Sequence, residues 1–164
     1  MDDSGESQKT HSKIVIAVEF LNTAADLWCD GSAYFAAMHL AAAAEELTGK
    51  ACRHAGRVNH FDERVKYVTR AVDGLGLTNV QKRVSELMYG AKNSIKHFSS
   101  PEDAEVALVP RDEASNYIRG AYQNFCELGL QELLSAEVLR VLDATSFYCD
   151  IDSQGADGPV TPSV

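Results

Sequence analysis

Residues 32–52 read SAYFAAMHLAAAAEELTGKAC, and this stretch decides the fold. Its apolar side chains recur at intervals of three and four positions, which is the periodicity of an α-helix. Ser32 is predicted to cap the helix, because a serine hydroxyl satisfies an unpaired N–H group of the first turn. Small residues at helical spacing let a neighbouring helix approach closely, so this helix is predicted to be central; they are Ala33, Ala36, Ala37, Ala41 and Ala44.

The same periodicity continues on both sides of this stretch, and no run of alternating apolar and polar residues of strand length recurs. The link 102–110 includes one short segment that reads as extended, Val106–Val109. The sequence therefore predicts an all-α fold, an up-and-down bundle of five to six helices. The further helices are expected from Ile14 to Trp28, from Phe61 to Val72, from the capping box Thr78-Asn79-Val80-Gln81 through His97, from Arg111 to Leu128, and from Gln131 to Ala144 after a break at Gly129.

The chain has 164 residues, which fits one compact domain. Residues 1–12 and 150–164 are rich in Asp, Ser and Gly and carry almost no large apolar side chains. Such segments bury too little surface to offset the entropy of ordering. We therefore expect a single helical domain over residues 13–149, with disordered tails at 1–12 and 150–164.

Charge is distributed unevenly along the chain. There are 24 acidic and 15 basic residues, a net charge of −9, which argues against a protein that coats nucleic acid or an anionic membrane with its whole surface. The segment Lys50–His97 differs, because it holds ten bases and four acids. These bases are either a solvated helix face or part of a binding site, and a nucleic-acid site requires them to gather in one place.

Cysteine usage and hydropathy bear on the compartment. The four cysteines form no CxxC pair, so they predict free, buried thiols and neither a disulfide framework nor a zinc site. The first residues, MDDSGESQKTHSK, lack the basic and apolar regions of a signal peptide. The longest apolar run, Ala33 to Ala44, is interrupted by His39 and is too short to cross a membrane. A cytoplasmic protein with no membrane contact is expected.

Several chemistries lack their motifs. The sequence contains no phosphate-binding GxxxxGK[ST], no GxGxxG after a strand, no GxSxG, and no E-x-x-H pair for a carboxylate-bridged metal centre. We therefore expect no cofactor and no metal. His39 lies in an apolar helix and is predicted to be a hydrogen-bonded core histidine. Near the end of the same helix, Glu45 and Glu46 are either two solvated glutamates, as is usual for Glu, or one of them faces a partner or a site, because acids there are unfavourable with the helix dipole.

The segment Lys92-Asn93-Ser94-Ile95-Lys96-His97 is the one stretch that suggests a site. It places a cation, an amide and an imidazole close together near the end of a predicted helix. On a phosphodiester, His97 would move a proton, Lys92 would balance phosphate charge and Asn93 would orient the substrate. The alternative is structural, since bases in a last turn stabilise a helix C-terminus by about 0.3–1 kcal/mol each.

This segment resembles the R-x(4–6)-H motif, often RNxxxH, of the HEPN (higher eukaryotes and prokaryotes nucleotide-binding) domains. Lys92 stands where that family has Arg, Asn93 at its Asn and His97 at its His. Ala36–Lys50 is similar to the family's Ala-rich second helix, and Asp112-Glu113-Ala114 with Ala121 is similar to the start of its final helices. Together these segments cover about two thirds of the chain. The guanidinium group of an arginine can bind phosphate through two N–H groups at once, whereas the ammonium group of Lys92 acts as a point charge.

The resemblance implies a helical bundle that dimerises with its two motifs facing each other, and a metal-independent endoribonuclease in active members. Lys92, Asn93 and His97 are then the catalytic residues, with Lys96 and Glu46 as substrate-binding residues. The implied partners are a second copy of the chain, RNA and an antitoxin-like protein. DNA is excluded as a substrate, because the nucleophile would be the 2′-hydroxyl of the RNA itself. The alternative function is a non-catalytic helical module for dimerisation or protein interaction.

Overall fold

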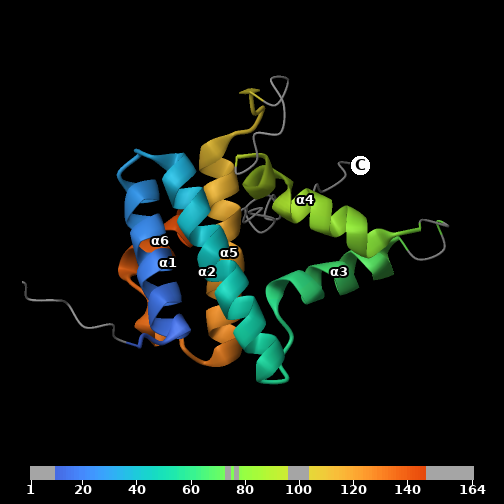
Figure 1. Ribbon diagram of the computed structural model, residues 1–164, viewed down its shortest axis with the longest axis horizontal. Coiled ribbons are helices and arrows are strands. Elements are labelled where there is room, and N and C mark those ends of the chain that lie inside the picture. The colour runs from blue at the N-terminus through green and yellow to red at the C-terminus, as the bar shows by residue number, and fades with distance from the viewer. Residues whose placement is uncertain (1–9, 73–74, 76–77, 96–103, 147–164) are drawn as a thin grey trace, which may run out of the picture.

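The structure is a computed structural model that describes residues 10–72, 75, 78–95 and 104–146 (Figure 1). This part of the chain is helical and contains no strand, so the predicted all-α class is confirmed. Residues 106–109, expected to be extended, form part of a loop. The elements are α1 (Lys13–Cys29), α2 (Tyr34–His54), α3 (His60–Ala71), α4 (Val80–Ser94), α5 (Pro110–Leu128), the short 3₁₀ helix η2 (Gln131–Leu133) and α6 (Ala136–Ala144).

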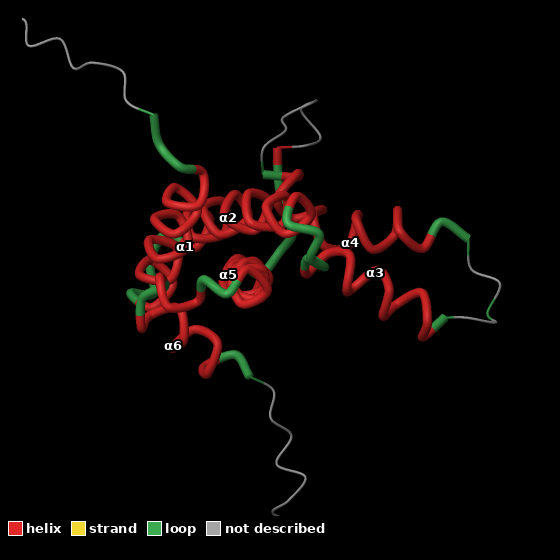
Figure 2. The backbone as a smooth tube through the Cα atoms, turned by 90° about the horizontal axis from the view of Figure 1, so that it is seen from below, coloured by secondary structure: helices red, strands yellow, loops and turns green. Residues whose placement is uncertain are grey.

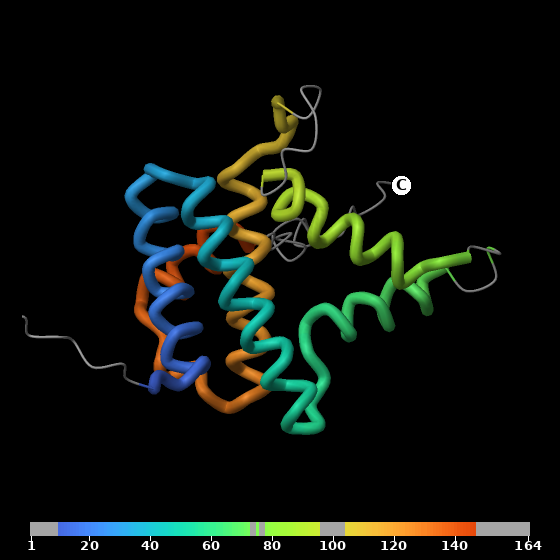
Figure 3. The backbone as a smooth tube through the Cα atoms, in the orientation of Figure 1, coloured from blue at the N-terminus to red at the C-terminus, as the bar shows by residue number. Residues whose placement is uncertain are grey.

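The helices form a bundle from which one hairpin projects. α2 packs against both α1 and α5, and α6 packs against α1 and α5. α2 and α5 run in the same direction, as the colours of Figure 3 show, because the α3–α4 hairpin makes the return between them. Seen from below, this hairpin extends sideways from the bundle (Figure 2). The space between the hairpin and the α2–α5 pair is where the candidate site lies.

The predicted central position of α2 is confirmed by its burial. The face of α2 toward α1 and α5 is lined by alanines, and Ala37, Ala41 and Ala44 are fully buried, whereas Ala33 and Ala36 are exposed. These small side chains let α1 and α5 approach α2 closely. The close packing buries apolar surface, which is the main stabilising term in a core. The large side chains that fill the remaining core space are fully buried, and they are Leu21, Met38, Ile118, Phe125, Val138 and Val141.

Two predicted N-caps are wrong. α2 begins after Ala33, which has φ of 49° and no side-chain cap, so Ser32 does not cap it. α4 likewise begins after Asn79, in the left-handed conformation with φ of 59° and no side-chain cap. Thr78 therefore lies one residue outside the cap position, and its capping box with Gln81 does not form. At both helices a tight turn of the backbone sets the start instead of a side-chain hydrogen bond.

The α3–α4 hairpin is less buried than the rest of the bundle. The start of α3 is capped by Asn59, whose side chain accepts from the Asp62 N–H. On α4, Val84 is buried, but the apolar side chain of Leu87 is 77% exposed. The reason is that α4 packs mainly on α3, and only its last turns reach α2 and the core. α4 ends at Ser94 with Ile95 as its C-cap, and the last two residues of the helix predicted through His97 lie outside the described residues.

The C-terminal part follows the prediction with one difference. Pro110 opens α5 at its first turn and Gly129 ends it with φ of 71°. The helix expected over 131–144 is divided into η2 and α6, because Leu134 is extended and the Ser135 N–H donates to the Asn22 side chain. None of the described helices has the length and apolar character that crossing a membrane requires.

The cysteines described are free thiols, as predicted, but they are not uniformly buried. Cys52 is buried, Cys29 is half-buried and Cys126 is exposed. The expectation of buried thiols is therefore wrong for Cys126, which lies on the outer face of α5.

Candidate functional site

An open groove of about 1020 Å³ lies between the end of α2, the start of α3 and the length of α4. Its polar lining includes cations from three places in the chain, Arg53, Lys82 and Lys92, and the amides of Gln81 and Asn93. The structure therefore brings Lys92 and Asn93, both predicted as site residues, to the wall of one groove. Glu46, predicted to bind substrate, also lines it.

Glu46 bridges two lysines at the edge of this groove. Its Oε1 accepts from Lys50 Nζ and its Oε2 accepts from Lys92 Nζ, each at 2.8 Å. Hydrogen bonds from Lys50 and Lys92 lower the pKa of Glu46 to about 2. The cluster of one acid and two cations has a net positive charge, and the Lys92 side chain is only 9% exposed. Lys92 is thus held by an acid instead of standing free as a phosphate-binding side chain.

The other predicted site residues are Asn93, Lys96 and His97. Asn93 is exposed on the rim of the groove, one residue beyond Lys92. Lys96 and His97 lie outside the described residues. The role of His97 in moving the proton therefore stays a prediction.

A pair of aromatic rings lines the groove beside Lys92. Phe61 of α3 and Tyr89 of α4 stack with their centroids 5.4 Å apart and an angle of 26° between the rings. Lys92 Nζ lies 5.6 Å from the centroid of the Tyr89 ring, within the range of a cation–π contact. The sequence does not indicate this pair, because Phe61 has the helical spacing of a core residue and Tyr89 lies outside the apolar spacing of its helix.

On the other side of Tyr89 lies a smaller, more enclosed cavity of about 250 Å³. It is bounded by α2, α3, α4 and α5. Its polar lining is Glu45, His60, Arg64, Tyr89, Glu113, Asn116, Tyr117 and Arg119, and its apolar wall includes Leu87 and Met88.

Glu45 is buried at this cavity, with 3% of its surface exposed. Its Oε1 accepts from the Tyr89 hydroxyl at 3.4 Å, a long hydrogen bond, and its Oε2 has no hydrogen-bond partner among the residues described. Burial raises the pKa of Glu45 to about 7, although the nearby Lys92 opposes this shift. A buried carboxyl group with such a pKa is able to hold or release a proton near neutral pH.

His60 is the buried histidine of the described chain, with 8% exposed. Its Nδ1 has no hydrogen-bond partner within the described ranges. Burial, together with the charges of Arg64 and Arg119, lowers the pKa of His60 to about 4, so its ring is neutral at pH 7. The prediction that His39 is the core histidine is wrong, because His39 is on the exposed face of α2.

The buried side chain of Asn124 fixes the helices around this cavity. Its Nδ2 donates to the Glu45 carbonyl at 3.2 Å and to Thr48 Oγ1 at 3.3 Å, while its Oδ1 accepts from the His60 N–H at 2.7 Å. One side chain of α5 thus ties α2 to the first residue of α3. Since the three bonds are buried, the positions of Glu45 and His60 are closely defined.

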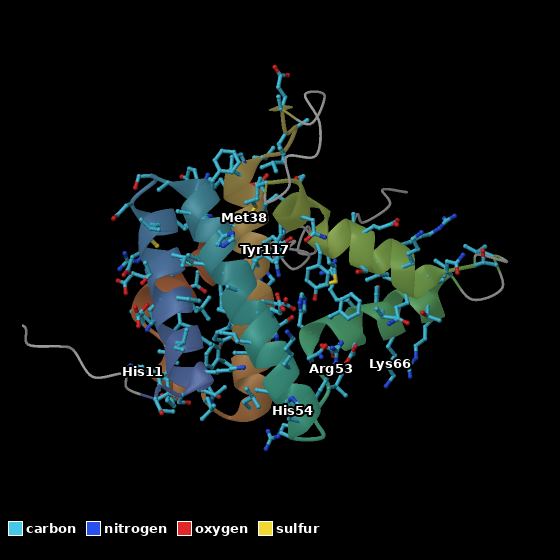
Figure 4. All side chains as sticks on the ribbon, in the orientation of Figure 1. His11, Met38, Arg53, His54, Lys66 and Tyr117 are labelled. Atoms are coloured by element: carbon cyan, nitrogen blue, oxygen red, sulfur yellow. The ribbon has the colours of Figure 1, made fainter. Side chains whose placement is uncertain are left out.

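The bases of Lys50–His97 are distributed over several surfaces. Each of the three cations in the groove has an acidic partner: Arg53 pairs with Asp62, Lys82 with Glu86 and, as described above, Lys92 with Glu46. Figure 4 places Arg53 where α2 approaches α3 and Lys66 further out along α3. Only part of the basic segment is therefore gathered beside Lys92. In the described part, no group of three His, Cys, Asp or Glu side chains is arranged to hold a metal ion.

Comparison with known proteins adds no family assignment. No family model, no curated protein and no solved structure matches this chain. The resemblance to HEPN domains therefore rests on the segments quoted above, and the function is argued from the groove and the cavity themselves.

Proposed function

We propose that the chain binds a short segment of single-stranded RNA in the groove beside Lys92 and cleaves it without a metal. The observation that carries the binding part is the Lys50–Glu46–Lys92 cluster, in which two ammonium groups share one carboxylate. Such a cluster favours an anion, because one positive charge is left without an acidic partner inside it. A phosphate that takes the place of Glu46 on Lys92 leaves Glu46 still paired with Lys50.

The aromatic pair supports RNA as the anion's source. Single-stranded RNA is bound largely by stacking of bases on aromatic side chains combined with cations along the backbone. Tyr89, half-buried in the groove wall and stacked on Phe61, lies directly beside Lys92. A base on this ring places its own phosphate within reach of the lysine cluster. Exposed amides at Gln81 and Asn93 add hydrogen-bonding groups for base edges.

The charge of the groove supports a short segment of RNA over a long one. Arg53 and Lys82 are each paired with an acid, so the lysine cluster is the main source of excess positive charge. A protein that neutralises one or two phosphates of a single strand shows a salt slope of about −0.7 per phosphate. Binding is therefore expected to weaken only moderately with added salt.

The cleavage part rests on the resemblance to HEPN domains and on His97. In this mechanism His97 moves the proton of the substrate's 2′-hydroxyl, whose oxygen attacks the adjacent phosphorus. The bond from phosphorus to the 5′-oxygen of the next nucleotide breaks, that oxygen leaves as a hydroxyl after taking up a proton, and a 2′,3′-cyclic phosphate end remains. Lys92 balances charge on the phosphate and Asn93 orients it. Cleavage is then expected to persist in EDTA, to fail on DNA, to depend on pH near about 6.5, and to be lost in His97→Ala.

Dimerisation through the α3–α4 hairpin is part of the proposal. Tyr67 and Leu87 on this hairpin are 74% and 77% exposed, and Val68, Val72 and Val84 line a shallow hollow beside Leu87. An apolar surface of this kind suits a second copy of the chain or an antitoxin-like protein. The same surface favours the alternative function, a non-catalytic interaction module, should the groove take no RNA.

The binding test compares fluorescence anisotropy of a labelled ten-nucleotide RNA with the full chain and its variants. Lys92→Gln is expected to weaken binding by about tenfold, because it removes a charge-assisted contact to phosphate, whereas Lys92→Arg preserves or strengthens it. Lys66→Gln removes the same charge from α3 outside the groove and serves as the control. Absence of RNA binding at micromolar protein, or equal affinity of wild type and Lys92→Gln, would overturn the proposal.

A further inference from the structure

We propose that a further cavity, lined by residues from α3, the first half of α5 and the ends of α1 and α6, binds a small phosphate monoester of the sugar phosphate class. Its volume is about 540 Å³, and its lining includes three arginines, Arg64 of α3 and Arg111 and Arg119 of α5. In the described part of the chain this cavity and the RNA groove have no lining residue in common. The site is therefore separate from the groove of the proposed function.

The cavity concentrates positive charge in a chain whose net charge is −9. Its described lining holds three arginines and the single acid Asp112, so three positive charges and one negative charge leave a net charge of +2. Among the described residues, the ion pairs involve other side chains and none of the three arginines takes part in one. Like charges around one cavity repel each other, and a bound anion with two negative charges removes this repulsion.

Arg111 is held at the cavity by the core tryptophan. Its guanidinium carbon lies 4.7 Å from the centroid of the Trp28 ring, a cation–π contact, and its carbonyl accepts from the Trp28 indole N–H at 2.9 Å. Trp28 is only 6% exposed, so it forms a rigid support for the arginine. The cation–π contact neutralises no charge, and the guanidinium group stays able to bind a phosphate through two N–H groups at once. Because the side chain is already positioned, it loses less conformational freedom on binding.

Arg119 is fixed in the wall of the same cavity but has a different part. Its Nη2 donates to the Thr145 carbonyl at 3.0 Å and to the Thr145 hydroxyl at 2.8 Å. Both acceptors are neutral, so the positive charge of Arg119 is not compensated by them. Arg119 therefore contributes attraction at a fixed position, whereas Arg64 and Arg111 are the side chains that would contact the phosphate oxygens.

Charge and lining together define the class of ligand. A phosphate monoester carries about −1.5 to −2 charges at pH 7 on one compact group, which matches the net charge of +2. The volume of about 540 Å³ falls within the roughly 300–1,000 Å³ of small-molecule pockets, so the phosphate is expected to carry an organic group. The exposed amide of Asn116 and the hydroxyl of Ser146 suit the hydroxyl groups of a sugar. A nucleobase has no free ring to stack on in the described lining, because Trp28 is buried and is contacted by Arg111.

The test is calorimetric titration of the full chain with ribose 5-phosphate in a buffer without phosphate. Binding with a dissociation constant below about 1 mM is expected. Ribose is the control without the anion, and no binding of ribose is expected up to about 10 mM. Inorganic phosphate lacks the sugar and is expected to bind more weakly than ribose 5-phosphate. Succinate has two separated carboxylates in place of one dianionic group and is expected to bind at least about tenfold more weakly.

Variants assign the site to the arginines. Arg111→Gln is expected to weaken binding of ribose 5-phosphate at least about tenfold, and Arg111→Lys less, because lysine keeps the charge but not the two-pronged contact. Arg64→Gln, at an exposed side chain, is expected to weaken it several-fold and provides the test if Arg111→Gln does not fold. Arg70→Gln removes the same charge from α3 outside the cavity and is expected to leave binding unchanged. Affinity for the labelled RNA is expected to stay unchanged in all four variants, so this proposal and the proposed function fail independently.

Four results would overturn the sugar phosphate site. Ribose 5-phosphate does not bind up to about 10 mM, or it binds Arg111→Gln and Arg64→Gln as tightly as wild type. Succinate binds as tightly as ribose 5-phosphate. Arg111→Gln weakens RNA binding as much as Lys92→Gln does, which would make RNA the ligand of this cavity. Finally, the sequence after Ser146 carries the acids Asp150, Asp152 and Asp157 and no base, and binding seen only after these three are replaced by Asn would make this segment the occupant.

Discussion

Replacement of Glu45 by glutamine is expected to change how the stability of the protein depends on pH. The pKa of Glu45 is raised from 4.5 in the unfolded chain to about 7 in the fold. Between these values the unfolded chain releases the proton while the folded chain keeps it, so the wild type loses stability as pH rises. Below pH 4.5 both states are protonated and the loss is absent; above pH 7 it is complete.

The magnitude follows from the pKa difference. At about 1.36 kcal/mol per pH unit, the rise from 4.5 to about 7 corresponds to about 3 kcal/mol, of which about 2–3 kcal/mol develops between pH 5 and pH 8. The burial of Glu45, 3% exposed, means that solvent screens little of this effect. The glutamine side chain of the variant does not ionise, so the variant is expected to gain about this amount relative to wild type over that range.

His60 makes the comparison with wild type necessary. Its pKa is lowered from 6.5 to about 4, so its contribution to stability rises with pH over that interval and opposes that of Glu45. The two effects partly cancel in the wild type below pH 6.5. The difference between the variant and wild type removes the His60 contribution and isolates that of Glu45.

Urea unfolding of both proteins at pH 5 and pH 8 measures this difference. Glu46→Gln is the control, because Glu46 is the neighbouring acid but is about half exposed and its pKa is lowered. Between pH 5 and pH 8 the change in the stability difference between Glu46→Gln and wild type is expected to have the opposite sign and to stay below about 1 kcal/mol. A stability difference between Glu45→Gln and wild type that is the same at both pH values would refute the burial of an unpaired carboxyl group.

Further predictions concern the packing that positions the cavity. Gly120→Ala is expected to destabilise the fold by about 1–3 kcal/mol in thermal or urea unfolding, because its Cβ would lie 2.6 Å from His60 Nδ1. Gly90→Ala is the control, because Gly90 is a helical glycine with no atom within 4 Å of the added Cβ, and it should instead stabilise the fold by about 0.5–1 kcal/mol. Destabilisation by both substitutions would show that helix context, not His60, is responsible. Asn124→Ala is expected to lower the free energy of unfolding by about 2–3 kcal/mol, because three buried hydrogen bonds are lost. Gln123→Ala, at an exposed position beside it, is expected to lower it by no more than about 0.5 kcal/mol, and equal losses would contradict the described network.

The helices were predictable because their signals are local. The spacing of alanines in 33–44 identified α2 as central, and Gly129 marked the end of α5, since each depends only on neighbouring residues. The starts of α2 and α4 were mispredicted because Ala33 and Asn79 adopt left-handed backbone conformations, which depend on the path of the whole turn. Ser32 and Thr78 have the right chemistry for a cap, but each lies one residue too early.

The candidate site was predictable only in part. Lys92, Asn93 and Glu46 share one groove, but the sequence did not show that Lys92 is paired with Glu46, because these residues are 46 positions apart. The burial of the histidines was mispredicted for the same reason, because it depends on residues that are distant in the sequence. His39 lies in an apolar stretch yet faces outward, whereas His60 follows a polar loop and is buried because α5 presents Gly120 and Asn124 to it.

The most direct test of the central claim is an amide-resolved NMR titration of the ¹⁵N-labelled full chain with a five-nucleotide single-stranded RNA. The account predicts shift changes on the groove wall, at Gln81, Lys82, Tyr89 and Asn93, with smaller changes when DNA of the same sequence is used. Lys92→Gln should reduce these changes. Shifts spread over α1 and α6, or none at any ratio of RNA to protein, would contradict RNA binding in the groove.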